Sequence, residues 1–279
     1  MKKVQTNFKM NCCESLYFYY DSHDHKIKIS NCTFGRMQNN IGELTPDEFY
    51  NLSEDRFYEY LYKIFHSKPI ICHNGASCES RWEKQEMEQI MVSLSRECNL
   101  SCPICYVKGG GHKDSLERKQ LYLSLIDKLK NLKFNTLQLT DWGEPLIYID
   151  EILDILKNYK YCKNLNIITN GTLFTKEVID KTLSVMNHLF VELDCDSLTK
   201  QTYESIRVGA DFNIFKNNLK NAISLYKDKD YQSKFDLRLA VTVTDRNKSE
   251  IEKIVKVFNF YKLNYRINDA WQPSIEYSY

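Results

Sequence analysis

The sequence predicts an α/β protein in which residues 88–279 form a partial (β/α)6 barrel of the TIM-like type and residues 1–87 form a small α+β cysteine-rich module. Two observations predict the fold of residues 88–279. From about residue 88, short apolar runs alternate with amphipathic helical patterns, which is typical of repeated β–α units around a parallel sheet. The apolar runs number six, fewer than the eight of a closed barrel. A third observation, strand-like runs among scattered cysteines, indicates that residues 1–87 form a separate module.

The six strands of the larger part are expected to lie side by side, with their connecting helices outside. In such an arrangement, reactive groups stand on the loops at the C-terminal ends of the strands. The strands are expected at residues 89–95, 136–140, 164–169, 188–194, 235–243 and 263–268.

Two of the helical patterns begin with a capping signal. Asp114 stands three residues before Glu117, and Ser249 stands three residues before Glu252, each ahead of an amphipathic run. Such a pair satisfies exposed backbone N–H groups at a helix start. Helices are therefore expected to begin at these two positions.

The N-terminal part is expected to hold strands at residues 15–20 and 26–30 and a helix at residues 55–65. So short a segment buries little apolar surface by itself, which favours stabilisation by a metal site. The boundary with the larger part is expected near residue 87.

Charge and composition exclude several classes of function. The chain of 279 residues has 38 basic and 37 acidic side chains, so it has no basic footprint for nucleic acid. Its N-terminus lacks the apolar core of a signal peptide, and no run is long enough to span a bilayer, so a cytoplasmic protein without a membrane partner is expected. In a reducing compartment, ten cysteines favour metal ligation over disulfides.

The most informative motif is a C-x3-C-x2-C triplet directly after the first expected strand of the larger part. Cys98, Cys102 and Cys105 provide three thiolates, enough for three corners of a [4Fe–4S] cluster. The fourth iron then has no protein ligand and is open to chemistry. The alternatives are a zinc site, which usually takes four protein ligands when structural, and three buried core thiols. The triplet favours catalysis.

Together with the repeats and the strand-end motifs, this triplet resembles the radical S-adenosylmethionine (SAM) enzymes over roughly residues 88–270. The resemblance implies that Cys98, Cys102 and Cys105 hold the cluster and that its open iron binds the amino and carboxylate groups of SAM. Reduction then gives a 5′-deoxyadenosyl radical. Ile104 matches a bulky position that contacts the adenine, and Tyr106 follows where aromatic residues are common.

The second and third expected strands end in turns that resemble cofactor-binding turns of the same family. Gly143, Glu144 and Pro145 match the end of a Gly-Gly-Glu-Pro motif that binds the methionine amino group, with Trp142 in place of the first glycine. Asn170 lies in a turn that borders the cofactor. The resemblance therefore assigns these residues to SAM binding.

The fourth strand resembles a Ser-x-Asp strand end with a downstream Ile-Arg pair. Glu192 stands in place of the serine, with an expected contact to the ribose or methionine of SAM. Asp194 and Arg207 are expected at the ribose hydroxyls and the methionine carboxylate; the alternative is an ion pair between them. Cys195 is a candidate hydrogen-atom donor to a substrate radical, the alternative being a small buried hydrophobe.

The N-terminal cysteines resemble, in their order, the auxiliary-cluster module called SPASM, although that module usually follows the radical domain. Cys32, Cys72 and Cys78, together with Cys13 or its neighbour Cys12, would supply four thiolates for an auxiliary Fe–S cluster. Zinc at the same set, or free thiols, are the alternatives.

The resemblance implies reductive cleavage of SAM and hydrogen abstraction from a substrate. A peptide or protein side chain is the first candidate substrate, as in peptide maturation, with a reductant such as flavodoxin or ferredoxin as partner. A sugar, nucleoside or other small metabolite is the second candidate. A non-catalytic Fe–S or zinc protein is the alternative of a different class.

Overall fold

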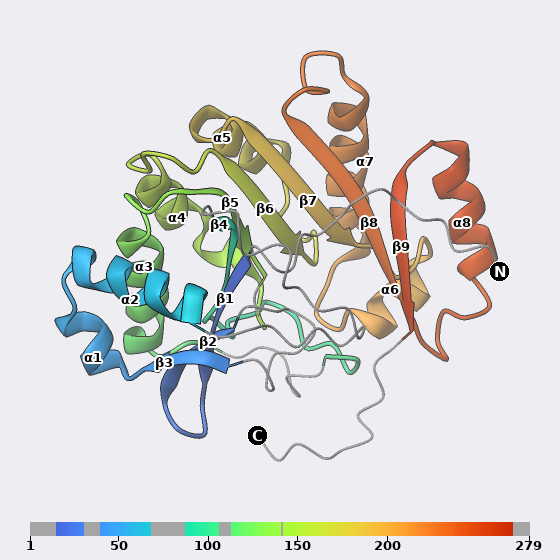
Figure 1. Ribbon diagram of the computed structural model, residues 1–279. Helices are drawn as coiled ribbons and strands as arrows, with labels where there is room; N and C mark the ends of the chain where they lie inside the picture. The colour runs from blue at the N-terminus through green and yellow to red at the C-terminus, as the bar shows by residue number, and fades with distance from the viewer. Residues whose placement is uncertain (1–14, 31–39, 68–86, 106–112, 141, 270–279) are drawn as a thin grey trace.

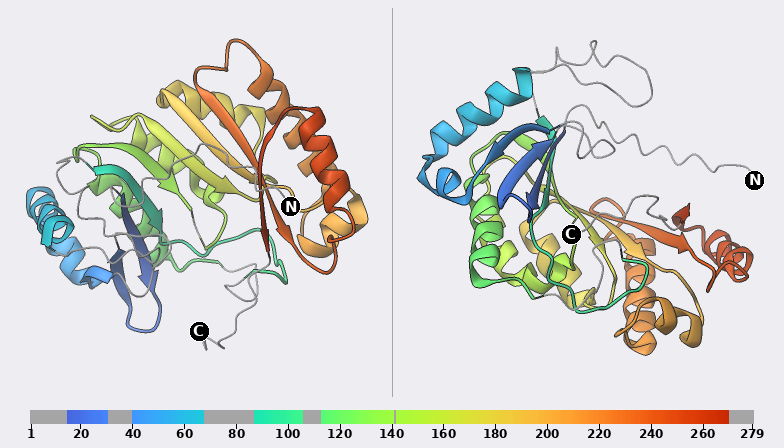
Figure 2. Two further views of the ribbon diagram at one scale, coloured as in Figure 1. Left: turned by 45° about the vertical axis from the view of Figure 1, so that its right-hand side comes forward. Right: turned by 90° about the horizontal axis from the view of Figure 1, so that it is seen from below.

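A computed structural model describes residues 15–30, 40–67, 87–105, 113–140 and 142–269. Its strands form one sheet of nine, in the order β3-β2-β1-β4-β5-β6-β7-β8-β9 (Figure 1). Neighbouring strands from β4 to β9 are parallel. The sheet is curved and does not close into a barrel (Figure 2). The predicted α/β fold with an open parallel sheet is confirmed.

All six strands expected in the larger part are present, with ends that differ by at most two residues. Their side chains alternate between an apolar face and a polar face. On β7, for example, Leu189, Val191 and Leu193 belong to the hydrophobic core, whereas Glu192 lies on the other face. The strands are β4 (Met87–Ser93), β5 (Phe134–Leu139), β6 (Asn164–Thr169), β7 (His188–Asp194), β8 (Phe235–Val243) and β9 (Asn264–Asp269).

The helices of the larger part cover the apolar, convex face, and none of the described helices lies on the concave face (Figure 2). None of the helices described is long and apolar enough to cross a membrane. They are α3 (Leu116–Lys128), α4 (Ile149–Leu156), α5 (Lys176–Val185), α6 (Lys200–Ile206), α7 (Phe212–Lys227) and α8 (Ile251–Phe260), with the short 3-10 helix η3 (Pro145–Tyr148).

The cap expected at Asp114 is displaced by one residue. Ser115 is the N-cap of α3, and its hydroxyl accepts the backbone N–H of Arg118 at 3.2 Å. The Asp114 carboxylate instead accepts the N–H of Arg96 at 3.0 Å. Asp114 therefore holds the loop after β4 rather than the helix.

The cap expected at Ser249 is also wrong. Helix α8 begins at Ile251 after Glu250, which makes no side-chain cap. The Glu250 carboxylate accepts hydrogen bonds from the hydroxyls of Ser197 at 2.6 Å and Thr202 at 2.5 Å. A tertiary contact has replaced the local one.

The described part of residues 1–87 continues the same sheet rather than standing apart. Strand β1 (Ser15–Asp21) pairs parallel with β4 and antiparallel with β2 (Lys26–Ser30), which pairs with β3 (Asn40–Leu44). Phe18 and Phe57 lie in a hydrophobic core that they share with residues of the larger part. The five cysteines expected to form an auxiliary site lie outside the described residues.

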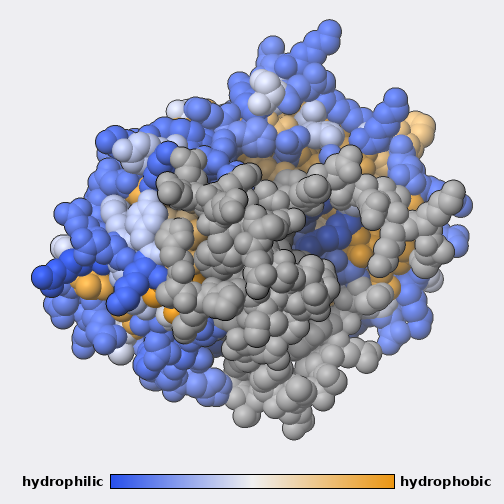
Figure 3. Space-filling model, in the orientation of Figure 1, coloured by the Kyte–Doolittle hydropathy of each residue, from blue (hydrophilic) through white to orange (hydrophobic). Residues whose placement is uncertain are grey.

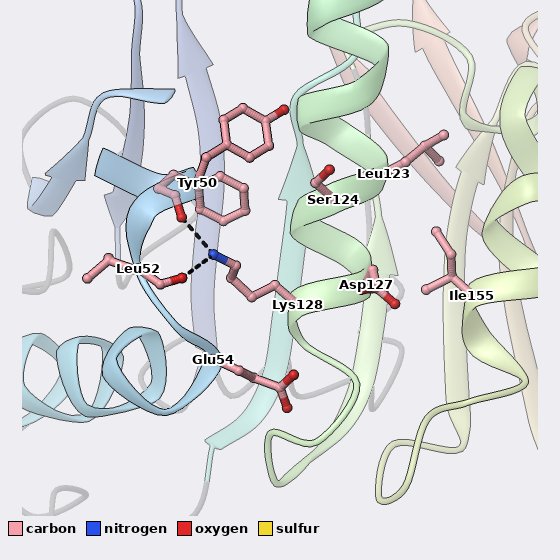
Figure 4. Close-up of a pocket in the computed structure, with 9 residues that line it drawn as sticks. Tyr50, Leu52, Glu54, Leu123, Ser124, Asp127, Lys128 and Ile155 are labelled. Carbon is pink, nitrogen blue, oxygen red and sulfur yellow. Dashed lines mark hydrogen bonds between the residues drawn. The ribbon is translucent and has the colours of Figure 1, made fainter. Parts of the chain in front are cut away.

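Helices α1 (Pro46–Asn51) and α2 (Glu54–Ser67) extend the outer layer next to α3 (Figure 1). The link between them is tied to α3 by Lys128, whose ammonium group donates to the carbonyls of Phe49 at 2.6 Å and Leu52 at 2.7 Å (Figure 4). The Tyr58 hydroxyl donates to the Lys128 carbonyl at 2.8 Å. The N-terminal helices are thus fixed to the first helix of the larger part.

Candidate active site

The loop that follows β4 carries the cysteine triplet along the C-terminal edge of the sheet. Cys98 and Cys105 are half-buried and Cys102 is buried. The N–H of Cys105 donates to the carbonyl of Cys102 at 3.0 Å, and the N–H of Ser101 donates to the carbonyl of Val208, after α6, at 2.8 Å. The triplet is therefore fastened to the segment after α6 as well as to β4.

Gly143 brings the turn after β5 against this loop. A Cβ atom at this position would lie 2.1 Å from the backbone oxygen of Glu97, so a side chain would collide with main chain. The next residue, Glu144, donates its N–H to the same oxygen at 2.7 Å. Only glycine permits this approach of two backbones, which explains the glycine kept beside Trp142.

Glu144 joins the ends of β5 and β6. Its side chain is 1% exposed and accepts the Thr169 hydroxyl at 2.7 Å and the backbone N–H groups of Asn170 at 2.8 Å and Leu146 at 3.2 Å. Burial raises the pKa of this carboxyl to about 7, against the lowering effect of those hydrogen bonds. The expected cofactor residue is thus also the link between two strand ends, and buried Pro145 begins η3 directly after it.

Asn170 connects the third strand end to the cysteine loop. Its amide nitrogen donates to the side-chain oxygen of Asn99 at 3.0 Å, and its oxygen accepts the Thr172 N–H at 2.9 Å. Asn218 of α7 supports the turn by donating to the carbonyls of Gly171 at 3.0 Å and Thr172 at 2.9 Å. Gly171 has φ of 79°, which favours glycine. Asn99 and Asn218 are members of this network that the sequence motifs did not identify.

Arg207 lies between two aspartates and a cysteine of the triplet. Its Nη2 is 3.0 Å from Asp194, its Nε donates to Asp196 at 2.6 Å, and it hydrogen-bonds the Cys102 thiol. Burial raises the pKa of Asp194 to about 6, opposed by Arg207. The ion pair considered as an alternative for Asp194 and Arg207 is present. Asp196, which is fully buried, is a further partner of Arg207. Side chains alternate between the two faces of a strand, so its position two residues after Asp194 would have indicated it.

Glu192 lies at the concave face but already has two partners. Arg238 of β8 donates its Nε to Glu192 at 2.6 Å, and Arg266 of β9 bonds the other carboxylate oxygen. Glu192 is fully buried. Its carboxylate is thus engaged by two arginines, neither of which was selected from the sequence.

Cys195 does not reach the concave face. It is fully buried, belongs to the hydrophobic core, and its pKa is raised by burial. Asp194 precedes it on the polar face, so Cys195 points to the apolar side, a position that favours the alternative over a hydrogen donor. It is the small core residue considered as the alternative. Ile104 is half-buried in the cysteine loop, and Tyr106 lies outside the described residues.

The chemistry of the cysteine loop fits an iron–sulfur cluster. Burial, helped by the neighbouring Glu144, Cys102 and Cys105, raises the pKa of Cys98 to about 11 against a lowering hydrogen bond from the Leu100 N–H, so the three thiols act on one another. Burial also raises the pKa of Cys102, whereas Arg207 lowers it. Thiols that repel each other's charge gain most from a bound cation, because ligation releases their protons. Among the described residues, no group of three or more His, Cys, Asp or Glu side chains, the cysteine triplet included, is placed so that it could hold a metal ion.

A polar concave face lies below this loop. Gln138 of β5 pairs in register with Asn166 of β6. At the β1 side the face becomes aromatic: Tyr19 stacks on Trp142 with ring centroids 6.4 Å apart. The site is therefore a cysteine loop above an open sheet face that is polar at one side and aromatic at the other.

A cysteine loop, three strand-end turns and an open parallel sheet define a protein of the cluster-binding partial-barrel class. The family model described as "Radical SAM superfamily" matches residues 92–258, so the chain belongs to the radical SAM superfamily and is a radical SAM enzyme. Membership in this family implies a [4Fe–4S] cluster and SAM.

Known relatives agree with this assignment over part of their length. "Probable GTP 3′,8-cyclase" of Saccharolobus islandicus (strain Y.N.15.51 / Yellowstone #2) is 24% identical over 173 residues, 61% of this chain and 53% of the relative. The protein of that name from Pyrococcus horikoshii is 30% identical over 118 residues, 42% of this chain and 37% of the relative. The chain thus spans about half the length, or less, of these curated relatives.

Solved structures that resemble the chain include SuiB of Streptococcus suis. It is 12% identical and has a TM-score of 0.48. The match covers 93% of this chain and 62% of SuiB. Methylornithine synthase (PylB) is 14% identical and has a TM-score of 0.45. The match covers 80% of this chain and 66% of PylB.

Proposed function

We propose that this chain cleaves SAM reductively at a cluster held by Cys98, Cys102 and Cys105 and abstracts hydrogen from a substrate on the concave face. The observation that carries the proposal is the meeting of the cysteine loop with two strand-end turns and the end of α6, through Glu97 with Gly143, Asn99 with Asn170, and Cys102 with Arg207. When bound, the cluster and SAM supply a 5′-deoxyadenosyl radical. An external reductant such as flavodoxin or ferredoxin provides the electron.

The chain's own residues hold the cysteine loop in place and orient SAM. Gly143 admits the backbone of the loop, Glu144 fixes the neighbouring turn, and Arg207 offers a cation beside Cys102 for the SAM carboxylate. The two aspartates at Arg207 keep that cation in place. Orientation of the reacting groups is the protein's contribution in cofactor enzymes of this kind.

A peptide or protein side chain is the first proposed substrate class. Its support is the order of the N-terminal cysteines, which resembles a SPASM module, with an auxiliary Fe–S cluster at Cys13 or Cys12 and Cys32, Cys72 and Cys78 as part of the proposal. A sugar, nucleoside or other small metabolite is the second candidate, and a nucleotide is favoured among these because the relatives named above are called GTP cyclases.

The test is a SAM cleavage assay with the anaerobically reconstituted protein. Reduction with dithionite and addition of SAM should yield 5′-deoxyadenosine, and replacement of Cys98, Cys102 and Cys105 by alanine should abolish both the product and the iron of this cluster. Ser101→Ala, an exposed change inside the same loop, is the control and should retain both. No product from a protein with an intact cluster would contradict the proposal.

A further inference from the structure

Glu97, the residue directly before Cys98, is held through both its backbone and its side chain. Its carbonyl accepts the N–H of Glu144, in the turn after β5, at 2.7 Å. One oxygen of its carboxylate, Oε2, accepts the N–H of Asp114 at 3.2 Å and the hydroxyl of Tyr148. The residue that precedes the first cysteine of the triplet is therefore bonded to the turn after β5, to η3 and to the start of α3.

The carboxylate of Glu97 is directed inward rather than to solvent. The coloured surface in Figure 3 is mostly hydrophilic, as expected where charged side chains face water. Glu97 is instead half-buried, and within the described part of the chain its carboxylate forms no ion pair and accepts one N–H and one O–H. Hydrogen bonds to an ionised acceptor are stronger than neutral ones. These two bonds replace the water that the carboxylate has lost.

Tyr148 is fixed on its other side by helix α3. It is 4% exposed, its ring centroid lies 6.1 Å from that of Tyr122, and the ammonium group of Lys119 lies 4.7 Å from its ring centroid. A buried tyrosine needs a partner for its hydroxyl. Burial and the bond to Glu97 raise the pKa of this hydroxyl, so it keeps its proton and donates it to the carboxylate.

Glu97 contacts residues 143–148 at two separate points. The first is the turn, where the Glu97 carbonyl lies so close to Gly143 that a Cβ there would be 2.1 Å away. The second is Tyr148, at the end of η3. One contact would leave this segment free to pivot against the cysteine loop, whereas two contacts, one at each end, fix its orientation.

We propose that Tyr148 is a positioning residue for SAM, because its hydroxyl, through Glu97, fixes the turn at Gly143 and Glu144 relative to Cys98. The inference rests on the proposed function, in which SAM meets both the cluster and this turn. The separation of the two then governs the affinity for SAM, and residues that hold ligands in place contribute to it without touching SAM.

Tyr148→Phe tests the role in the full chain after anaerobic reconstitution. SAM is titrated against the reduced protein and followed by the electron paramagnetic resonance of the cluster, and iron is measured separately. The variant should retain its iron, and its Kd for SAM should rise roughly tenfold. Tyr159→Phe is the matched control, because it removes another buried hydroxyl, which donates to the Ile126 carbonyl at 2.6 Å. It should lower stability comparably and leave the Kd unchanged.

Glu97→Gln separates the hydrogen bonds from the charge. Both bonds end on Oε2, so an amide oxygen in that place can accept both while the charge is removed. We expect its Kd for SAM to stay within about twofold of the parent value, because the positions of the two segments are kept.

Three results would overturn the role of Tyr148: a parent-like Kd in Tyr148→Phe, an equal rise in Tyr159→Phe, or a rise in Glu97→Gln as large as that in Tyr148→Phe. Each of them leaves the proposed function standing, provided that the parent protein binds SAM. A parent cluster whose resonance does not respond to SAM would instead remove the proposed function, and the role of Tyr148 with it.

Discussion

The backbone N–H of Asn170 donates a 2.8 Å hydrogen bond to the buried carboxylate of Glu144. This bond ties the end of β6 to the turn after β5, and Gly143 ties the same turn to the cysteine loop. Three strand ends are thus held by one carboxylate and one glycine. Changes at either residue are expected to act on stability and on cofactor binding together.

The pH dependence of stability should reveal the buried Glu144. Its folded pKa of about 7 lies above the ordinary value of 4.5, so the folded state binds the proton more tightly. The resulting stabilisation is present below about pH 4.5 and is lost as the pH rises through 7. Between pH 5 and pH 7 we expect this carboxyl to cost the parent protein roughly 2 kcal/mol of unfolding free energy.

Glu144→Gln isolates that contribution, because glutamine does not titrate. Urea denaturation of both proteins at pH 5 and pH 7 measures it. The variant should be less stable at pH 5, where it loses an acceptor for Asn170, and the gap should narrow by roughly 2 kcal/mol at pH 7. A gap that is independent of pH would show that Glu144 titrates normally in the folded protein.

Gly143→Ala should damage the site through the backbone. The added Cβ would meet the Glu97 carbonyl at 2.1 Å, and main chain cannot move aside as a side chain does. We expect a loss of about 1–3 kcal/mol in unfolding free energy and weaker SAM binding by the reconstituted protein.

Gly42→Ala is the matched control, because its Cβ would meet the end of the Tyr60 side chain at 2.6 Å, far from the cysteine loop. It should lower stability less and leave SAM affinity unchanged. Equal SAM affinity in both variants would remove the assigned role of Gly143.

The strands were predictable because burial on one or both faces leaves a regular apolar signal. What failed were features decided by distant partners. Asp114 has the sequence pattern of a helix cap, yet its carboxylate accepts the backbone N–H of Arg96 instead. The partners of Glu192 lie 46 and 74 residues away, and β1 joins β4 across a long intervening segment. No local pattern records such pairings, whereas the cysteine loop and the three strand-end turns are local motifs and were found.

Asp196→Asn should weaken SAM binding by displacing Arg207. The carboxylate of Asp196 accepts Arg207 Nε at 2.6 Å and the N–H of Thr242 at 2.7 Å, and asparagine can keep only one of these. We expect the Kd for SAM to rise roughly tenfold, equivalent to about 1.4 kcal/mol. Asp245→Asn, an exposed change from the same residue type, should leave the Kd unaltered. Binding measured by calorimetry below the unfolding temperature separates this effect from stability, and an unchanged Kd would show that Asp196 serves the fold alone.

The iron content of cysteine variants tests whether the N-terminal cysteines hold an auxiliary cluster. Cys72→Ala together with Cys78→Ala should remove the additional iron and leave that of the triplet, whereas replacement of Cys98, Cys102 and Cys105 should leave the additional iron in place. Iron and sulfide analysis with electron paramagnetic resonance of the reduced proteins measures both. If the triplet variant retains no iron, the auxiliary cluster does not exist.

Lys128→Met tests how firmly the N-terminal helices are held. Methionine keeps the aliphatic stem but leaves the carbonyls of Phe49 and Leu52 without their donor. Burial lowers the pKa of Lys128, so its ammonium group has lost water and needs these carbonyls as hydrogen-bond partners. The loss of two charged hydrogen bonds should cost about 1–3 kcal/mol in unfolding free energy.

Lys130→Met removes a surface pair with Asp127 and should cost less than about 1 kcal/mol. Hydrogen exchange should then locate the difference, with faster exchange in α1 for the Lys128 variant only. Equal stability and equal exchange in the two variants would show that Lys128 does not fasten α1 to α3.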